Sequence, residues 1–132
     1  MTTNDTGWID VPYAAANFWA KAPLQWKVTE KGVMTYAYRV QGKTMTLSFK
    51  IDESTLAGLP ANELYIRIPA NYLPNRSMAN PIWLGSQLGK ECGYLTVHPG
   101  RPFLVLFRET EGLFPIEPKN FVAFGQLTFE VQ

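Results

Sequence analysis

Hydrophobic and polar residues alternate with a period of two along much of this chain. Such alternation over residues 33–41, and again over 44–52, predicts two β-strands that each have one apolar face. Gly42 and Lys43 stand between them, and a glycine at the first of two loop positions suits a type II′ hairpin turn. The register that this turn imposes pairs apolar residues throughout, namely Val40 with Met45, Tyr38 with Leu47, Tyr36 with Phe49 and Met34 with Ile51.

Further strands are expected at intervals of roughly ten residues, which is typical of a sandwich or a barrel. They cover residues 8–11, 24–28, 63–68, 82–88, 93–97, 102–108 and 121–131. The ten prolines and ten glycines leave little space for a long helix. Residues 54–59 are expected to form one helical turn or a loop. The pattern therefore predicts an all-β fold, most simply an antiparallel, jelly-roll-like β-sandwich of eight to nine short strands.

Two other β-architectures fit the pattern less well. An immunoglobulin-like sandwich remains an alternative, although the single Cys92 rules out its usual disulfide. A five-stranded OB barrel would leave several of the expected strands unassigned.

Length and composition restrict the possible partners. A chain of 132 residues fits one domain, so residues 1–132 are expected to form a single β-sandwich, with 1–7 as a flexible N-terminal segment. The net charge of +1 gives no strong field to attract nucleic acid or an anionic membrane. Residues 1–7 are polar, so we expect no signal peptide there, and no apolar run reaches the roughly 18 residues of a membrane helix. We therefore expect no nucleic-acid partner, no membrane partner and no cofactor.

Two late strands are apolar on both faces, which is unusual for a sheet in a lone sandwich. Phe103, Val105 and Phe107 would lie on one face of their strand, opposite Leu104 and Leu106. The second face would be covered either by a long loop or by another subunit. Charged residues make up only 17% of the chain, which favours the subunit. The residues predicted to form an oligomer interface are Leu104, Leu106, Val122 and Phe124.

Candidate catalytic groups are few. Asp5-Thr6-Gly7 matches the tripeptide of aspartic proteases, but only four polar residues precede it, so no buried strand can support it. Cys92 and His98 are the only residues of their kinds, and we interpret them as a partly buried structural thiol and a surface-turn histidine. A small hydrolase that uses them is retained only as a third hypothesis. The sequence therefore predicts a protein that is not an enzyme and holds no metal.

Aromatic residues fall into two groups by position. Those on expected strands are assigned to the core, namely Trp8, Trp26, Tyr36, Tyr38, Phe49, Phe103, Phe107 and Phe129. Trp19, Tyr72, Trp83 and Phe114 fall in or near expected loops. Loop aromatics either stack on sugar rings, anchor a protein partner or cap the ends of the sandwich. Trp19, Tyr72 and Trp83 are the candidates for ligand stacking.

Four stretches resemble a family of small β-sandwich modules in tailed-phage virions, where they occur as capsid decoration proteins and as modules of tail or head fibres. The stretches are Trp8-x-x-Val11-Pro12-Tyr13 with Asn17-Phe18, Tyr36-x-Tyr38 with Gly42-Lys43-Thr44-Met45-Thr46-Leu47-Ser48-Phe49, Leu64-x-Ile66-x-Ile68-Pro69, and Gly125-Gln126-Leu127-Thr128-Phe129-Glu130-Val131. Trp19 departs from the small polar residue usual after the phenylalanine, and residues 71–100 match nothing in the family.

The resemblance implies a non-enzymatic virion component, made in the host cytoplasm, that assembles as a homotrimer. Its partners would be copies of itself and other virion proteins or a host-surface glycan. None of the four stretches names a binding residue, so no site follows from the resemblance. The alternative function is that of a carbohydrate-binding module that uses Trp19, Tyr72 or Trp83.

Overall fold

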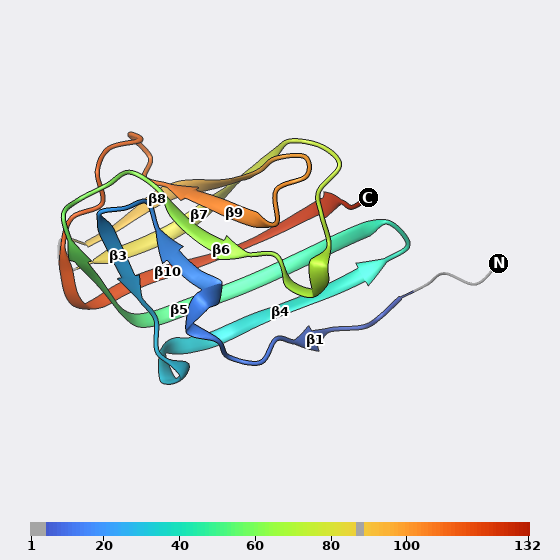
Figure 1. The fold of residues 1–132 in the computed structure, drawn as a ribbon, viewed down its shortest axis with the longest axis horizontal. Coiled ribbons are helices and arrows are strands. Elements are labelled where there is room, and N and C mark those ends of the chain that lie inside the picture. The colour runs from blue at the N-terminus through green and yellow to red at the C-terminus, as the bar shows by residue number, and fades with distance from the viewer. Residues whose placement is uncertain (1–4, 87–88) are drawn as a thin grey trace.

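A computed structural model describes residues 5–86 and 89–132 and shows an all-β protein (Figure 1). Ten antiparallel strands form one strongly curled open sheet, a half-barrel. The described residues contain no α-helix, only the short 3-10 turns η1 (Ala15–Asn17), η2 (Glu30–Gly32) and η3 (Pro69–Asn71). The strands are β1 (Ile9–Asp10), β2 (Phe18–Ala20), β3 (Leu24–Lys27), β4 (Val33–Gln41), β5 (Thr44–Gly58), β6 (Leu64–Arg67), β7 (Met78–Ser86), β8 (Gly89–Val97), β9 (Phe103–Phe107) and β10 (Glu117–Glu130).

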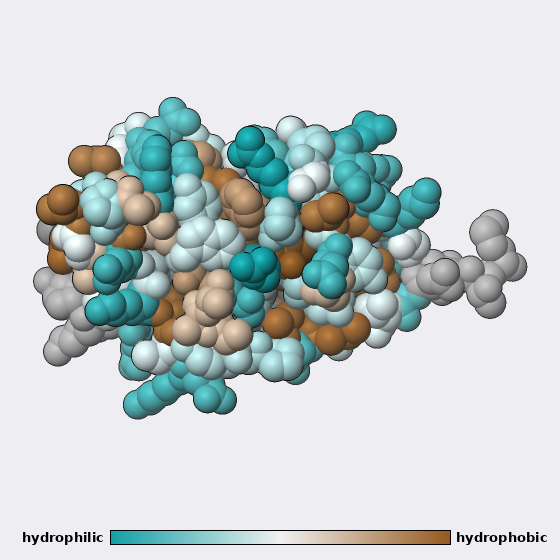
Figure 2. Space-filling view, viewed as in Figure 1, coloured by the Kyte–Doolittle hydropathy of each residue, from teal (hydrophilic) through white to brown (hydrophobic). Residues whose placement is uncertain are grey.

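The strand order across the sheet is β1-β4-β5-β10-β7-β8-β9-β6-β2, and β3 pairs separately with β5. Because the sheet curls, β4, β5 and β10 lie along one side of the molecule and β6 and β9 lie along the other (Figure 1). The buried apolar side chains lie inside this curl. On the face of the molecule drawn in Figure 2, small hydrophobic groups are separated by hydrophilic side chains.

The predicted antiparallel all-β fold is confirmed, but its details differ. The structure has ten strands in one continuous sheet, whereas the sequence predicted eight to nine strands in a sandwich. The strand missed by the sequence is β2, which at three residues is too short to show a periodic pattern. The expected strand at 82–88 corresponds to β7, which begins earlier, at Met78; its expected last residues, 87 and 88, lie outside the described residues.

The β4–β5 hairpin has the predicted register over most of its length. Val40 lies opposite Met45 and Tyr36 opposite Phe49, and Gly42 has the positive φ of 61° that a type II′ turn requires at its first position. The prediction for Met34 is wrong. A register shift between Val33 and Thr35 places Val33 opposite Ile51, so Met34 turns outward with 59% of its surface exposed.

The segment expected to be a helical turn or loop at 54–59 is instead the second half of β5. Glu53 has a φ of 51°, and the register of β5 against β10 shifts at this point. The extra residue of such a bulge changes which residues point inward. Before it Ile51 is buried, and after it Ser54 and Leu56 are buried. The bulge also lets one long strand pair first with β4 and then with β3.

Side chains hold together the two ends of the curled sheet. The ring of Phe18 on β2 lies 5.8 Å from Trp26 on β3 and 5.3 Å from Tyr36 on β4. The Tyr36 hydroxyl donates a hydrogen bond to the carbonyl of Arg67 on β6, and burial raises its pKa. On the same side of the core, the Trp26 indole N–H donates to the buried Ser54 hydroxyl at 2.9 Å. These contacts close the core without a complete barrel.

The N-terminal segment is more ordered at residues 5–7 than the expected flexible tail, while residues 1–4 lie outside the described part of the chain. Asp5 forms an isolated bridge with Gln41, and its carboxylate accepts hydrogen bonds from Arg39 at 2.5 and 3.0 Å. The Gly7 backbone N–H also donates to this carboxylate, at 2.8 Å. The match to an aspartic-protease tripeptide is therefore a surface turn that is paired with β4.

We expect Asp5→Asn to loosen residues 5–7 from β4. Hydrogen bonds from Arg39 and then Gly7 lower the pKa of Asp5 from 3.8 to about 2. The ion pair therefore stabilises the docked segment above pH 4, and this stabilisation is lost as the pH falls towards 2. Amide exchange of Thr6, whose N–H bonds to the Val40 carbonyl at 3.0 Å, measures the docking. Asp10→Asn in β1 is the matched control, and equal Thr6 exchange in all three proteins would contradict the expectation.

Candidate functional site

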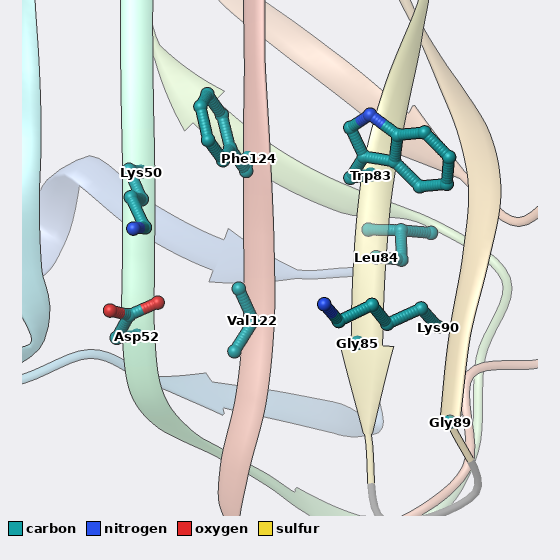
Figure 3. Close-up of a pocket in the computed structure, with 9 residues that line it drawn as sticks. All are labelled: Lys50, Asp52, Trp83, Leu84, Gly85, Gly89, Lys90, Val122 and Phe124. Carbon is teal, nitrogen blue, oxygen red and sulfur yellow. The ribbon is translucent and has the colours of Figure 1, made fainter.

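The outer face of the sheet has an open apolar groove of about 720 Å³ over β5, β10, β7 and β8 (Figure 3). Trp83 on β7 and Phe124 on β10 are its large side chains, and they are 60% and 45% exposed. Both residues point outward because their neighbours Leu84 and Ala123 fill the core. A large exposed tryptophan beside a phenylalanine on rigid strands indicates a contact surface.

The groove is organised as two rows of residues that run across the strands. In the first row, Lys50 pairs with Phe124, Phe124 with Trp83, and Trp83 with Cys92. In the second row, Val122 pairs with Gly85, and Gly85 with Lys90. Asp52 lines the groove beside Val122, at the β5 end of this row (Figure 3).

The charged side chains of the groove come from its two outer strands, and that of Lys90 reaches across β7 towards β10 (Figure 3). Asp52 and Lys50 come from β5, and Lys90 comes from β8. The Lys50 ammonium lies 5.5 Å from the centre of the Phe124 ring, a cation–π contact. The two ion pairs formed by described residues, Arg39–Asp5 and Arg108–Glu91, involve neither Asp52 nor Lys90. Asp52 and Lys90 thus carry opposite charges from the two ends of the second row, and neither forms an ion pair with a described residue.

The predicted oligomer interface is wrong in half of its residues. Leu104 and Leu106 are 0% exposed, and their strand partners Ile66 and Leu64 are buried in the same core. They face inward, so no subunit can contact them. Alternation could not reveal this, since both faces of β9 are apolar. Val122 and Phe124 do lie on the outer face, where both line the groove.

The outer face of β9 is covered by side chains of the same chain. Trp19 lies 5.6 Å from Phe103, and Tyr65 lies 5.4 Å from the same ring, so Val105 beneath them is buried. The Arg67 guanidinium lies 5.4 Å from the Trp19 ring. Trp19 was expected in a loop but belongs to β2, and its contacts make it part of this aromatic cover.

The other aromatic predictions have mixed outcomes. Tyr72 follows η3 and packs 6.1 Å from Tyr38 on β4; both rings pack against the core, and neither lines the groove. Phe114 is buried in a loop, and its backbone N–H donates to the Ala61 carbonyl. Trp8 was assigned to the core but is exposed. Of the three predicted stacking residues, only Trp83 stands in a groove, and it does so from a strand.

Three further titratable side chains, those of Cys92, Tyr94 and His98, lie on β8 or directly after it. Cys92 is an exposed free thiol on the outer face, not the partly buried one expected. His98 lies after β8, with Nε2 3.3 Å from the Thr96 hydroxyl, and it has no contact with Cys92. The Tyr94 hydroxyl donates to Glu111, which raises the pKa of Tyr94 to about 12.

Two further searches of the described residues give no site. No group of three or more His, Cys, Asp or Glu side chains is placed to hold a metal ion. Among the helical segments that the structure describes, none is long and apolar enough to cross a membrane.

Lys50, Asp52, Gly85 and Lys90 were not identified from the sequence as members of a site. Lys50 and Asp52 follow the polar face of their expected strand, but nothing local places them beside residues 83–90. Comparison of the chain with family models, curated proteins and solved structures finds no match.

Proposed function

We propose that this chain is a non-enzymatic module of a tailed-phage virion, of the capsid decoration or fibre type. It acts as a rigid β-scaffold that associates with copies of itself. We also propose that the two halves of the half-barrel, which face each other across the core, are equivalent to the two sheets of a jelly-roll-like sandwich. The observation that carries the proposal is the outward pair Trp83 and Phe124 in the groove over β5, β10, β7 and β8.

Three features support a contact surface rather than a reaction centre. The groove is open, its base is a sheet, and its exposed lining is predominantly apolar. Its charged side chains come from the two outer strands, and Asp52 and the Lys90 ammonium lie on either side of Val122, so they do not converge on one point as an acid and a base must in catalysis (Figure 3). Large aromatic residues of this kind dominate the energy of protein contacts.

The virion assignment depends on the resemblance of the four stretches named above. The partners proposed are copies of the chain, in the trimer that the resemblance implies, and other virion proteins or a host-surface glycan. The location proposed is the virion.

Carbohydrate binding is the second candidate, and one observation favours it. Trp83 exposes its ring in the same groove as Asp52, Lys50 and Lys90, whose polar groups could hydrogen-bond to sugar hydroxyls while the indole stacks on the ring. Binding to a glycan array that is lost in Trp83→Ala, with a monomeric wild-type protein, would favour this function over self-association.

Self-association predicts that Phe124→Glu yields a folded monomer. A carboxylate placed in the apolar centre would have to lose its hydration on assembly, which disfavours association. Sedimentation equilibrium measures the mass, and circular dichroism measures the fold. The control is Met34→Glu, which places the same charge on an exposed residue outside the groove lining. A wild-type protein that stays monomeric at every concentration would overturn the proposal.

A further inference from the structure

Each of the two rows of the groove would fit against the same row of a second copy that is turned by a half rotation. A line parallel to the strands, drawn between β10 and β7, divides the face into β5 and β10 on one side and β7 and β8 on the other. In each row, the residues on β5 and β10 differ in size and charge from those on β7 and β8. When two copies face each other about a two-fold axis along it, β10 of one copy lies against β7 of the other, and β5 lies against β8.

Each strand contact in such a pair brings together side chains of complementary shape or charge. Phe124 of one copy meets Trp83 of the other, an aromatic pair. Val122 meets Gly85, which has no side chain of its own and lies beside the Lys90 side chain (Figure 3). Asp52 meets Lys90, so the charges that flank the groove become ion pairs, twice over by symmetry.

We propose that two copies of this chain pair face to face through the groove, about a two-fold axis parallel to β10 and β7, with Asp52 of each copy beside Lys90 of the other. This pairing rests on the self-association in the proposed function, and it gives that association a two-fold contact in place of the three-fold contact of a trimer. It commits to a second copy because Asp52 and Lys90, at the two ends of the same row, carry opposite charges that a reversed copy brings together. Two sheets packed in this way lie about 10 Å apart, close enough for these side chains to meet.

Exchanging the two charges tests the pairing. Asp52→Lys alone sets lysine against Lys90, and Lys90→Asp alone sets aspartate against Asp52, so each variant should raise the dissociation constant more than about tenfold. An equimolar mixture of the two variants should regain the wild-type constant, because every contact in a mixed pair joins opposite charges. The double variant should regain it too. Asp10→Lys and Lys43→Asp, both exposed and outside the groove lining, are the matched controls.

Cys92 gives a second readout that does not depend on mass. In the pair, this thiol lies opposite Lys50 of the other copy, inside the contact. Its rate of labelling by a neutral thiol reagent should fall as the wild-type concentration rises. In Asp52→Lys alone, the labelling rate should stay constant over the same range.

The outcomes separate the pairing from the proposed function. Wild-type pairs that weaken in both single variants and recover in the mixture support the pairing. A wild-type protein that associates but ignores both charge variants, or that forms a trimer without a two-fold contact, overturns the pairing and leaves the virion module standing. A wild-type protein that is monomeric at every concentration overturns both.

Discussion

Leu104→Glu is expected to unfold the protein. Leu104 is 0% exposed and lies opposite Ile66 in the core, so the new carboxylate would have neither water nor a cation beside it. The change also removes the packing of a buried leucine, which alone contributes about 2–5 kcal/mol. Together these effects are on the order of the whole stability of a small domain, about 5–15 kcal/mol. Circular dichroism and the urea midpoint measure the loss.

The matched comparison for Leu104→Glu is Phe124→Glu, in which the same charge is placed on the outer face. Phe124 is already half-exposed, so this variant should stay folded and lose only its association. Leu104→Ala should lie between the two, folded but less stable. A folded Leu104→Glu protein with a lowered mass would show that Leu104 does face a partner and that the core assignment is wrong.

The sequence predicted the hairpin from β4 to β5 almost completely, because everything that fixes it is local. Gly42 supplies the turn, and the alternation around it decides which residues pair. The prediction failed at Met34 and again after Asp52, where bulges shift the alternation by one residue. A bulge depends on how neighbouring strands pair, so the sequence of one strand does not show it.

The groove was predicted only in fragments. Val122 and Phe124 were predicted to form an oligomer interface, and Trp83 was predicted to be an aromatic in or near a loop that stacks on a ligand. Their proximity depends on the strand order β5-β10-β7-β8, in which residues 50 and 124 become neighbours. Such long-range pairing cannot be derived from local patterns. The wrong choice of Leu104 has the same origin, since an all-apolar strand does not reveal which face meets the core.

Glycine at position 93 is required by a close approach between strands. An added Cβ would lie 2.4 Å from the Phe107 carbonyl oxygen and 2.6 Å from Leu84 Cδ1. The oxygen belongs to the backbone of β9, which pairs with β8 at this point, so it cannot move without disrupting that pairing. Gly93→Ala should therefore destabilise the fold by about 3 kcal/mol, which lowers Tm by roughly 10 °C.

A second glycine, Gly125 in β10, differs from Gly93 because an added Cβ would clash with a side chain and not with the backbone. Its added Cβ would lie 2.4 Å from Ile82 Cγ2, a side-chain atom. Gly125→Ala should therefore be partly rescued by Ile82→Ala, with a favourable coupling in a double-mutant cycle. Gly93→Ala should not be rescued by Leu84→Ala, because the Phe107 oxygen stays in place.

Gly85→Ala completes this series as the variant expected to have little effect. Its Cβ would point to the outer face and meet Val122 Cβ at 3.5 Å, an ordinary contact, so stability should change by less than about 0.5 kcal/mol. In the proposed pair, however, the new methyl group occupies the space that receives Val122 of the other copy. Gly85→Ala should therefore weaken association while Tm at low concentration is unchanged. A Gly93→Ala protein as stable as Gly85→Ala would show that β8 and β9 are not held as closely as the structure has them.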